Sequence, residues 1–100
     1  MARPRHLGFP PDRHLEDAKR DLDVAQRTAR MAADDLAKGR CGEAFDHASM
    51  AVSNAVAAHV HATGAARSPA FEAKLRGVHD LAYKVQRLVK RRCLRRMPEP

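Results

Sequence analysis

The side chains with the clearest chemistry in this sequence are basic residues near its C-terminal end. Residues 84–96, KVQRLVKRRCLRR, include seven Lys or Arg among thirteen positions. Cationic side chains neutralise phosphates and release counterions, so a helix that is basic on one side is typical of nucleic-acid binding. The residues that we expect to contact nucleic acid are Lys84, Arg87, Lys90, Arg91, Arg92, Arg95 and Arg96.

Other partners for this basic stretch are compatible with the same residues. An acidic protein would also bind a row of cations, and a solvated basic helix would keep a small protein soluble. Tyr83 is the only aromatic residue nearby, so base stacking is not expected. No helix-turn-helix spacing is present, which favours binding that tolerates any nucleic-acid sequence.

The histidines do not form a pattern that predicts a metal site. The sequence has six His, and no two of them have the i,i+3 or i,i+4 spacing that lets neighbouring turns of a helix hold one ion. No HExxH motif occurs. We therefore expect no metal and no cofactor.

The two cysteines, Cys41 and Cys93, bear on the environment of the protein. If the second and third helices pair antiparallel, Cys41 lies level with about Arg92, so the two thiols fall at the same end of the molecule. A disulfide there would close a long loop. Because thiols stay reduced in the cytoplasm, we expect free thiols.

The elements that must position these residues are three helices. Apolar residues recur at spacings of three and four, which predicts helices over 12–38, 43–63 and 69–94. Short connections favour antiparallel neighbours. The prediction is an all-α, three-helix, up-down-up antiparallel bundle with an Ala-rich core and a basic C-terminal helix. The residues expected to be buried are Leu22, Ala29, Val52, Ala55, Val78 and Val85.

The apolar seam of the third helix is expected to fail near its end, where Arg92 and Arg96 fall on the core side. Residues 1–11, with three Pro and one Gly, are interpreted as a flexible basic arm. Residues 12–97 form a single domain and 98–100 a tail. We expect no membrane-spanning segment, and a cytoplasmic location, or a virion if the protein is encoded by a bacteriophage.

Residues 44–63 are nearly free of charge, since Asp46 is the only acidic or strongly basic residue among them. A helix with so little charge on any side needs neighbours on several sides. Two neighbours within one chain would leave part of its apolar perimeter uncovered. We therefore expect a homo-oligomer that forms through Met50, Asn54 and Ala57.

The hairpin of the first two predicted helices resembles a known family. The small and apolar residues that carry the likeness are Leu36, Gly39, Ala44, His47, Ala48, Ala51, Val52, Ala55 and Val56. Over residues 15–64 this pattern is similar to the hairpin of HEPN domains, a helical superfamily of ribonucleases, toxins and non-catalytic proteins associated with RNA or nucleotides.

Catalytic HEPN domains have an Arg followed, after four to six residues, by a His late in the domain. Arg40 and His47 have this spacing but lie at the start of the second helix, whereas Arg76 and His79 lie late but too close together. The resemblance therefore implies a non-catalytic member.

The favoured function is a small non-enzymatic helical module that binds nucleic acid through its third helix and self-associates through its second. The alternative is a structural or adaptor subunit, for example of a phage, whose basic helix contacts an acidic protein or packaged DNA. A ribonuclease that uses Arg40 and His47 comes third.

Overall fold

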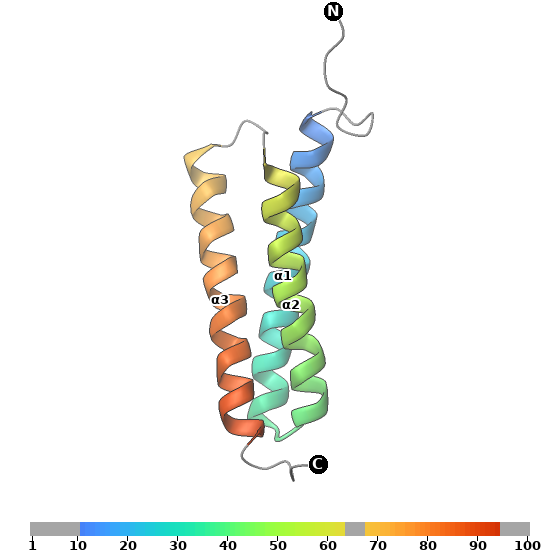
Figure 1. Cartoon of the computed structure of the whole chain (residues 1–100), viewed down its shortest axis with the longest axis vertical. Coiled ribbons are helices and arrows are strands. Elements are labelled where there is room, and N and C mark those ends of the chain that lie inside the picture. The colour runs from blue at the N-terminus through green and yellow to red at the C-terminus, as the bar shows by residue number, and fades with distance from the viewer. Residues whose placement is uncertain (1–10, 64–67, 95–100) are drawn as a thin grey trace, which may run out of the picture.

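Three antiparallel helices make up the computed structural model of the chain, which describes residues 11–63 and 68–94. The helices are α1 (Pro11–Ala37), α2 (Cys41–Ala62) and α3 (Pro69–Cys93). Figure 1 shows α1 and α3 running in one direction and α2 in the other. These ranges contain no strand, and each helix end lies within two residues of its predicted position. The prediction of an all-α, up-down-up bundle is confirmed.

Several sequence predictions fall where the structure describes nothing. These are the arm 1–11 apart from Pro11, the second turn around 65–67, the tail 98–100, and the two last basic residues, Arg95 and Arg96. Within the described ranges, no helix has both the length and the apolar character that a membrane-spanning segment needs.

A Schellman motif ends α1 and sets up the turn to α2. Gly39 has φ of +74°, a left-handed conformation that glycine adopts without steric cost. The Gly39 N–H donates to the carbonyl of Leu36, and the Arg40 N–H donates to the carbonyl of Asp35 over 2.8 Å. These two bonds satisfy carbonyls at the helix end that would otherwise lack a partner. The chain therefore reverses within three residues.

The start of α3 is fixed by Ser68 and Pro69. The Ser68 hydroxyl accepts a hydrogen bond from the Phe71 N–H at 3.1 Å, and Pro69 is the first helical residue. The hydroxyl satisfies one of the free N–H groups of the first turn, and proline has no N–H to satisfy. Serine before a first-turn proline is a common start for a helix, in agreement with the predicted helix start at 69.

Alanine seams hold α1 and α2 together, and these two helices share the largest interface of the bundle. The α2 seam is fully buried and consists of Ala44, Ala48, Ala51, Ala55, Ala58 and Ala62. It meets a seam on α1 that includes Ala18, Leu22, Ala25, Ala29 and Ala32, all without exposed area. Small side chains allow two helix backbones to approach closely, so this pair is the compact base of the fold.

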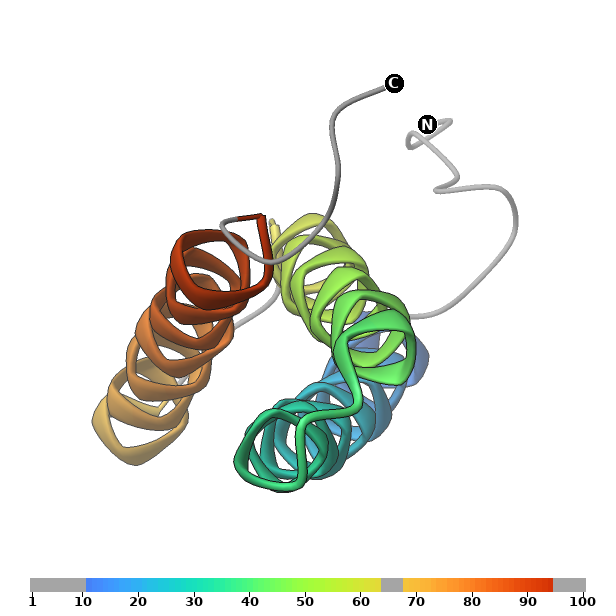
Figure 2. The same ribbon diagram turned by 90° about the horizontal axis from the view of Figure 1, so that it is seen from below.

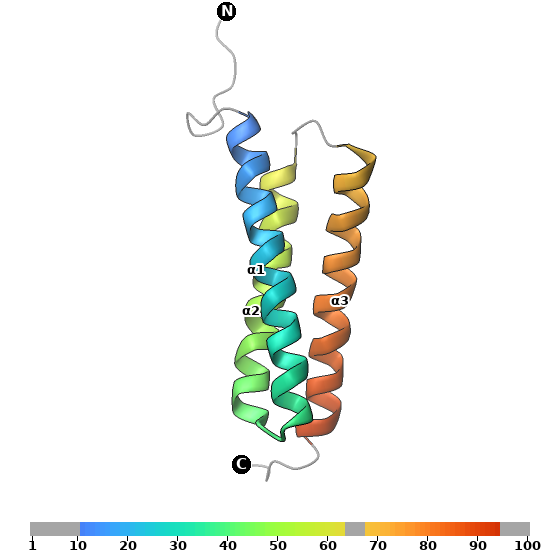
Figure 3. The same cartoon turned by 180° about the vertical axis from the view of Figure 1, so that it is seen from behind.

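The third helix packs on this pair through larger side chains. Its buried residues include Phe71, Leu75, Val78, Val85 and Val89. The view along the bundle in Figure 2 shows α3 beside the α1–α2 pair, and Figure 3 shows the same arrangement from behind. The contact of α3 with α1 is the smallest of the three helix interfaces.

Two packing predictions need correction. Val52 is half-buried rather than buried, because it lies on the flank of α2 rather than in the central alanine seam. Arg92 is exposed, and Cys93, which is fully buried, continues the core seam of α3 four residues after Val89. The seam therefore does not fail at the end of α3.

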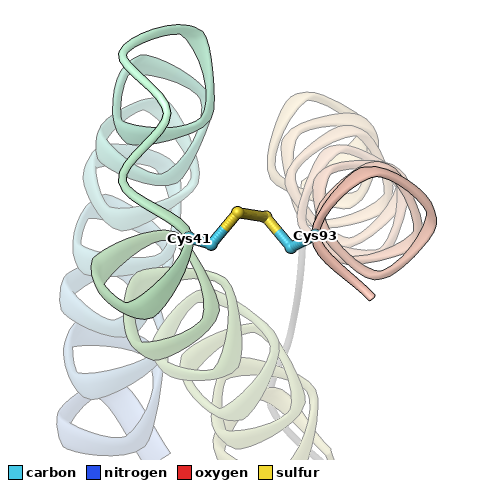
Figure 4. The surroundings of a disulfide bond; sticks show 2 residues. All are labelled: Cys41 and Cys93. Carbon is cyan, nitrogen blue, oxygen red and sulfur yellow. A yellow bond between two sulfur atoms is a disulfide. The ribbon is translucent and has the colours of Figure 1, made fainter. Parts of the chain in front are cut away.

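The prediction of free thiols is wrong. Cys41 at the start of α2 and Cys93 at the end of α3 form a disulfide, with 5.6 Å between their Cα atoms (Figure 4). The expected register of the two helices already placed the thiols at one end.

Candidate nucleic-acid interface

The cations of α3 lie at the surface. This helix has seven Lys or Arg and only two acidic residues, Glu72 and Asp80. Every one of the seven basic residues is exposed: Lys74, Arg76, Lys84, Arg87, Lys90, Arg91 and Arg92. The first five predicted binding residues, Lys84 to Arg92, are therefore accessible to a partner, while Arg95 and Arg96 lie outside the described residues.

Five of these cations form what we call the basic stripe: Arg76, Lys84, Arg87, Lys90 and Arg91. At 100° per residue they lie on the side of α3 opposite Val78, Val85 and Val89, which are buried in the core. With a rise of about 1.5 Å per residue, the stripe extends over about 22 Å of the helix axis. A partner can therefore contact it without displacing any core side chain.

Ion pairing within the chain leaves most of these charges available. Lys74 lies 3.6 Å from Asp23 of α1. Across residues 11–63 and 68–94, the other six cations of α3 have no carboxylate within 4 Å. Other carboxylates of α1 pair with cations of their own helix, as in Arg20–Asp17 and Lys38–Asp34. Apart from Lys74, the cations of α3 are therefore not neutralised by the acids of α1.

A hollow opens beside the basic stripe. It has a volume of about 270 Å³ and is lined by His79, Asp80, Tyr83 and Arg87. The ring of His79 packs against Tyr83, with 4.7 Å between ring centroids, and meets His59 of α2 edge-on at 5.1 Å. The sequence patterns described above do not predict this cluster. The available signal was the i,i+4 spacing of His79 and Tyr83, but the contribution of His59 depends on how α2 and α3 pack.

The two residues considered for ribonuclease chemistry are not joined by a hydrogen bond or ion pair in the described part of the chain. Arg40 is exposed and precedes the first residue of α2. His47 is half-buried, and its Nδ1 lies 2.5 Å from Oδ2 of Asp35, which is 6% exposed. This pair joins α1 to α2 and satisfies a buried carboxylate, a structural role that explains both residues.

A second histidine lies between carboxylates at the opposite end of the α1–α2 interface. Nδ1 of His61 is 3.8 Å from Asp17, and its Nε2 is 3.9 Å from Asp21. Burial raises the pKa of the Asp21 carboxyl above its ordinary value, although the His61 charge acts in the opposite direction. Within the described ranges, no group of three or more His, Cys, Asp or Glu side chains is placed to hold a metal ion.

The residues predicted for self-association are only partly on the surface. Met50 is 47% exposed, whereas Asn54 and Ala57 are half-buried. The Asn54 amide donates to the Met50 carbonyl of its own helix. Val56 and Val60, at 42% and 67% exposure, are the other large apolar side chains of α2 that reach solvent.

The chain matches no protein-family model, no curated protein and no solved structure. The likeness of residues 15–64 to the HEPN hairpin therefore stays a prediction from residue pattern. Functional inference rests on the chemistry of the described surfaces.

Proposed function

We propose that this protein is a non-enzymatic module that binds DNA or RNA through the basic stripe of α3, without sequence preference. The observation that supports this function is the set of cations on α3 that have no carboxylate partner in the described chain. A phosphate backbone would supply the missing negative charges. Sequence preference is not expected, because a long row of Arg and Lys contacts phosphates rather than base edges.

The separation of the stripe from the core supports the same proposal. Val78, Val85 and Val89 anchor the opposite side of α3, so binding requires no rearrangement of the bundle. Lys84, Arg87 and Arg91 follow one another at three and four residues, or about 4.5 and 6 Å along the axis. These intervals correspond to about one or two nucleotides of a strand, whose rise is about 3.4 Å per nucleotide.

The test uses a double variant, Arg87→Gln with Arg91→Gln, and a matched control that removes two exposed charges from α1, Arg27→Gln with Arg30→Gln. Affinity for a labelled oligonucleotide is measured by fluorescence anisotropy over a series of salt concentrations. The α3 variant should bind every sequence more weakly, and its slope of log affinity against log salt should fall by about 1.8 for duplex DNA. Melting temperatures should change little, because exposed charges contribute little to stability.

Equal weakening in the α1 control would show that net charge, and not the stripe, determines binding. If the parent protein binds no nucleic acid at low salt but binds polyglutamate, the acidic-partner alternative replaces this proposal.

We also propose that α2 mediates self-association. Supporting this, the exposed Val56 and Val60 lie within 49–63, where no Asp, Glu, Lys or Arg interrupts the surface. Two copies joined there would present two basic stripes and bind one nucleic acid more tightly than a single copy. Sedimentation should give twice the monomer mass for the parent and the monomer mass for Val60→Glu; a parent that remains monomeric at high micromolar concentration would refute this part.

A further inference from the structure

Three rings form a continuous row where α2 and α3 meet. His59 contacts His79 edge-to-face, at an interplanar angle of 87°, and His79 packs against Tyr83 at 43°. His79 and Tyr83 are half-buried. His79 lies between His59, which is exposed, and Tyr83, so the three rings form one aromatic cluster at the contact of α2 with α3.

The hollow of about 270 Å³ lies against this cluster. Pockets that enclose drug-sized molecules measure about 300–1,000 Å³, so this smaller hollow suits a single planar ring system. Its lining supplies three different chemistries. Tyr83 and His79 contribute aromatic rings, Asp80 contributes carboxylate oxygens that accept hydrogen bonds, and the Arg87 guanidinium contributes N–H donors and a positive charge.

Arg87 belongs both to the hollow and to the basic stripe. A strand whose phosphates follow the stripe therefore passes the edge of the hollow, with Lys84 three residues before Arg87 and Arg91 four residues after it. Asp80 is the one acid on this side of the described helix. Its carboxylate would repel a phosphate, but it can accept a hydrogen bond from an N–H group on the edge of a base, such as the N3–H of thymine.

We propose that the hollow binds one unpaired base of single-stranded DNA or RNA, stacked on Tyr83 and His79, while Arg87 binds the adjoining phosphate. This inference rests on the proposed nucleic-acid function and adds a preference for single strands. A paired base is stacked between its neighbours inside a duplex and cannot enter the hollow. Proteins that bind single strands combine a basic track with aromatic rings in the same way.

Tyr83 is itself the probe for this site, because the chain has one Tyr and no Trp. Intrinsic tyrosine fluorescence should be quenched by a short single-stranded oligo-dT. It should be quenched much less by a duplex, or by a strand of the same length built from abasic sugar-phosphate units. Each of the three ligands should still bind, as measured by anisotropy with end-labelled strands.

Two variants separate stacking from charge. Tyr83→Phe keeps the ring and should bind oligo-dT as the parent does. Tyr83→Leu loses the ring and should bind oligo-dT about tenfold more weakly, while its affinity for the abasic strand and the duplex stays unchanged. Unchanged affinity for those two ligands also shows that the Leu variant keeps the basic stripe folded.

The outcomes distinguish this inference from the function on which it rests. If Tyr83→Leu weakens all three ligands equally, or none of them, the base site is wrong and the basic stripe stands. If the parent binds none of the ligands at low salt, both the base site and the proposed function are wrong.

Discussion

Reduction of the Cys41–Cys93 disulfide should remove a large part of the stability of this domain. The bond joins residues that are 52 positions apart in the sequence. In the chain-entropy treatment, a closed loop of that length lowers the entropy of the unfolded chain by about 14 cal/mol/K, or about 4 kcal/mol at 25 °C. Domains are stable by only about 5–15 kcal/mol in total, so this contribution is a substantial share.

The assay is thermal unfolding followed by circular dichroism, with and without reductant. For a domain of this size, 1 kcal/mol shifts the melting temperature by about 4–8 °C. Reduction should therefore lower the melting temperature by about 15–30 °C. The double variant Cys41→Ala with Cys93→Ala should melt near the reduced parent and should not respond to reductant. Alanine is the appropriate replacement because Cys93 is fully buried and a serine hydroxyl there would lack a partner.

A thiol count on the denatured protein provides the control. It should find no free thiol before reduction and two after it. If the count confirms the disulfide and the oxidised and reduced proteins nevertheless melt within a few degrees of each other, the loop-closure reasoning is refuted. Two free thiols in the unreduced protein would instead show that the bond does not form.

Three further substitutions test the packing and electrostatics of the bundle by thermal melts. Ser68→Ala should cost about 1 kcal/mol, since it removes the acceptor for the Phe71 N–H. Ala55→Leu should cost about 1–3 kcal/mol, because a fully buried alanine seam cannot hold a larger side chain. Its matched control, Ala33→Leu at an exposed position of α1, should change the melting temperature little. Burial raises the pKa of Asp21 above 3.8, so the folded state keeps that proton to higher pH than the unfolded chain. Its contribution to stability must then fall as pH rises. The melting temperature of Asp21→Asn relative to the parent should increase between about pH 3 and pH 6.

The fold could be predicted because its determinants are local. Six of the seven alanines in residues 44–62 recur at spacings of four and three, the pattern of a buried helix seam, and those six are the buried residues of α2. Gly39 ends α1 and Ser68 precedes α3, and glycine and serine favour these positions at the ends of helices. The helix boundaries could therefore be predicted from residues close to them. Local signals of this kind depend on residues within one or two turns.

The parts that could not be predicted depend on contacts between helices. Nothing in the sequence near His59 indicates that it lies against His79, twenty residues later and on another helix. The buried pair of Asp35 and His47 is hidden for the same reason, although both residues are conspicuous polar breaks beside apolar seams. For Cys93, the register of α2 and α3 could be predicted, but whether two neighbouring thiols join is not determined by the residues around them.

The charge distribution explains why the basic stripe is on α3 and near its end. Like charges three or four residues apart on a helix, as in Lys84, Arg87 and Arg91, destabilise it by about 0.2–0.5 kcal/mol per pair. Near the C-terminal end this repulsion is offset, because Lys90, Arg91 and the following Arg92 lie in the last turn, where cations interact favourably with the helix dipole. The disulfide at Cys93 then fixes that same turn to α2. In this way α3, whose interfaces with α1 and α2 are smaller than the α1–α2 interface, holds a concentrated positive charge in place. Because most cations of α3 have no carboxylate partner in the described chain, this charge is accessible to a binding partner.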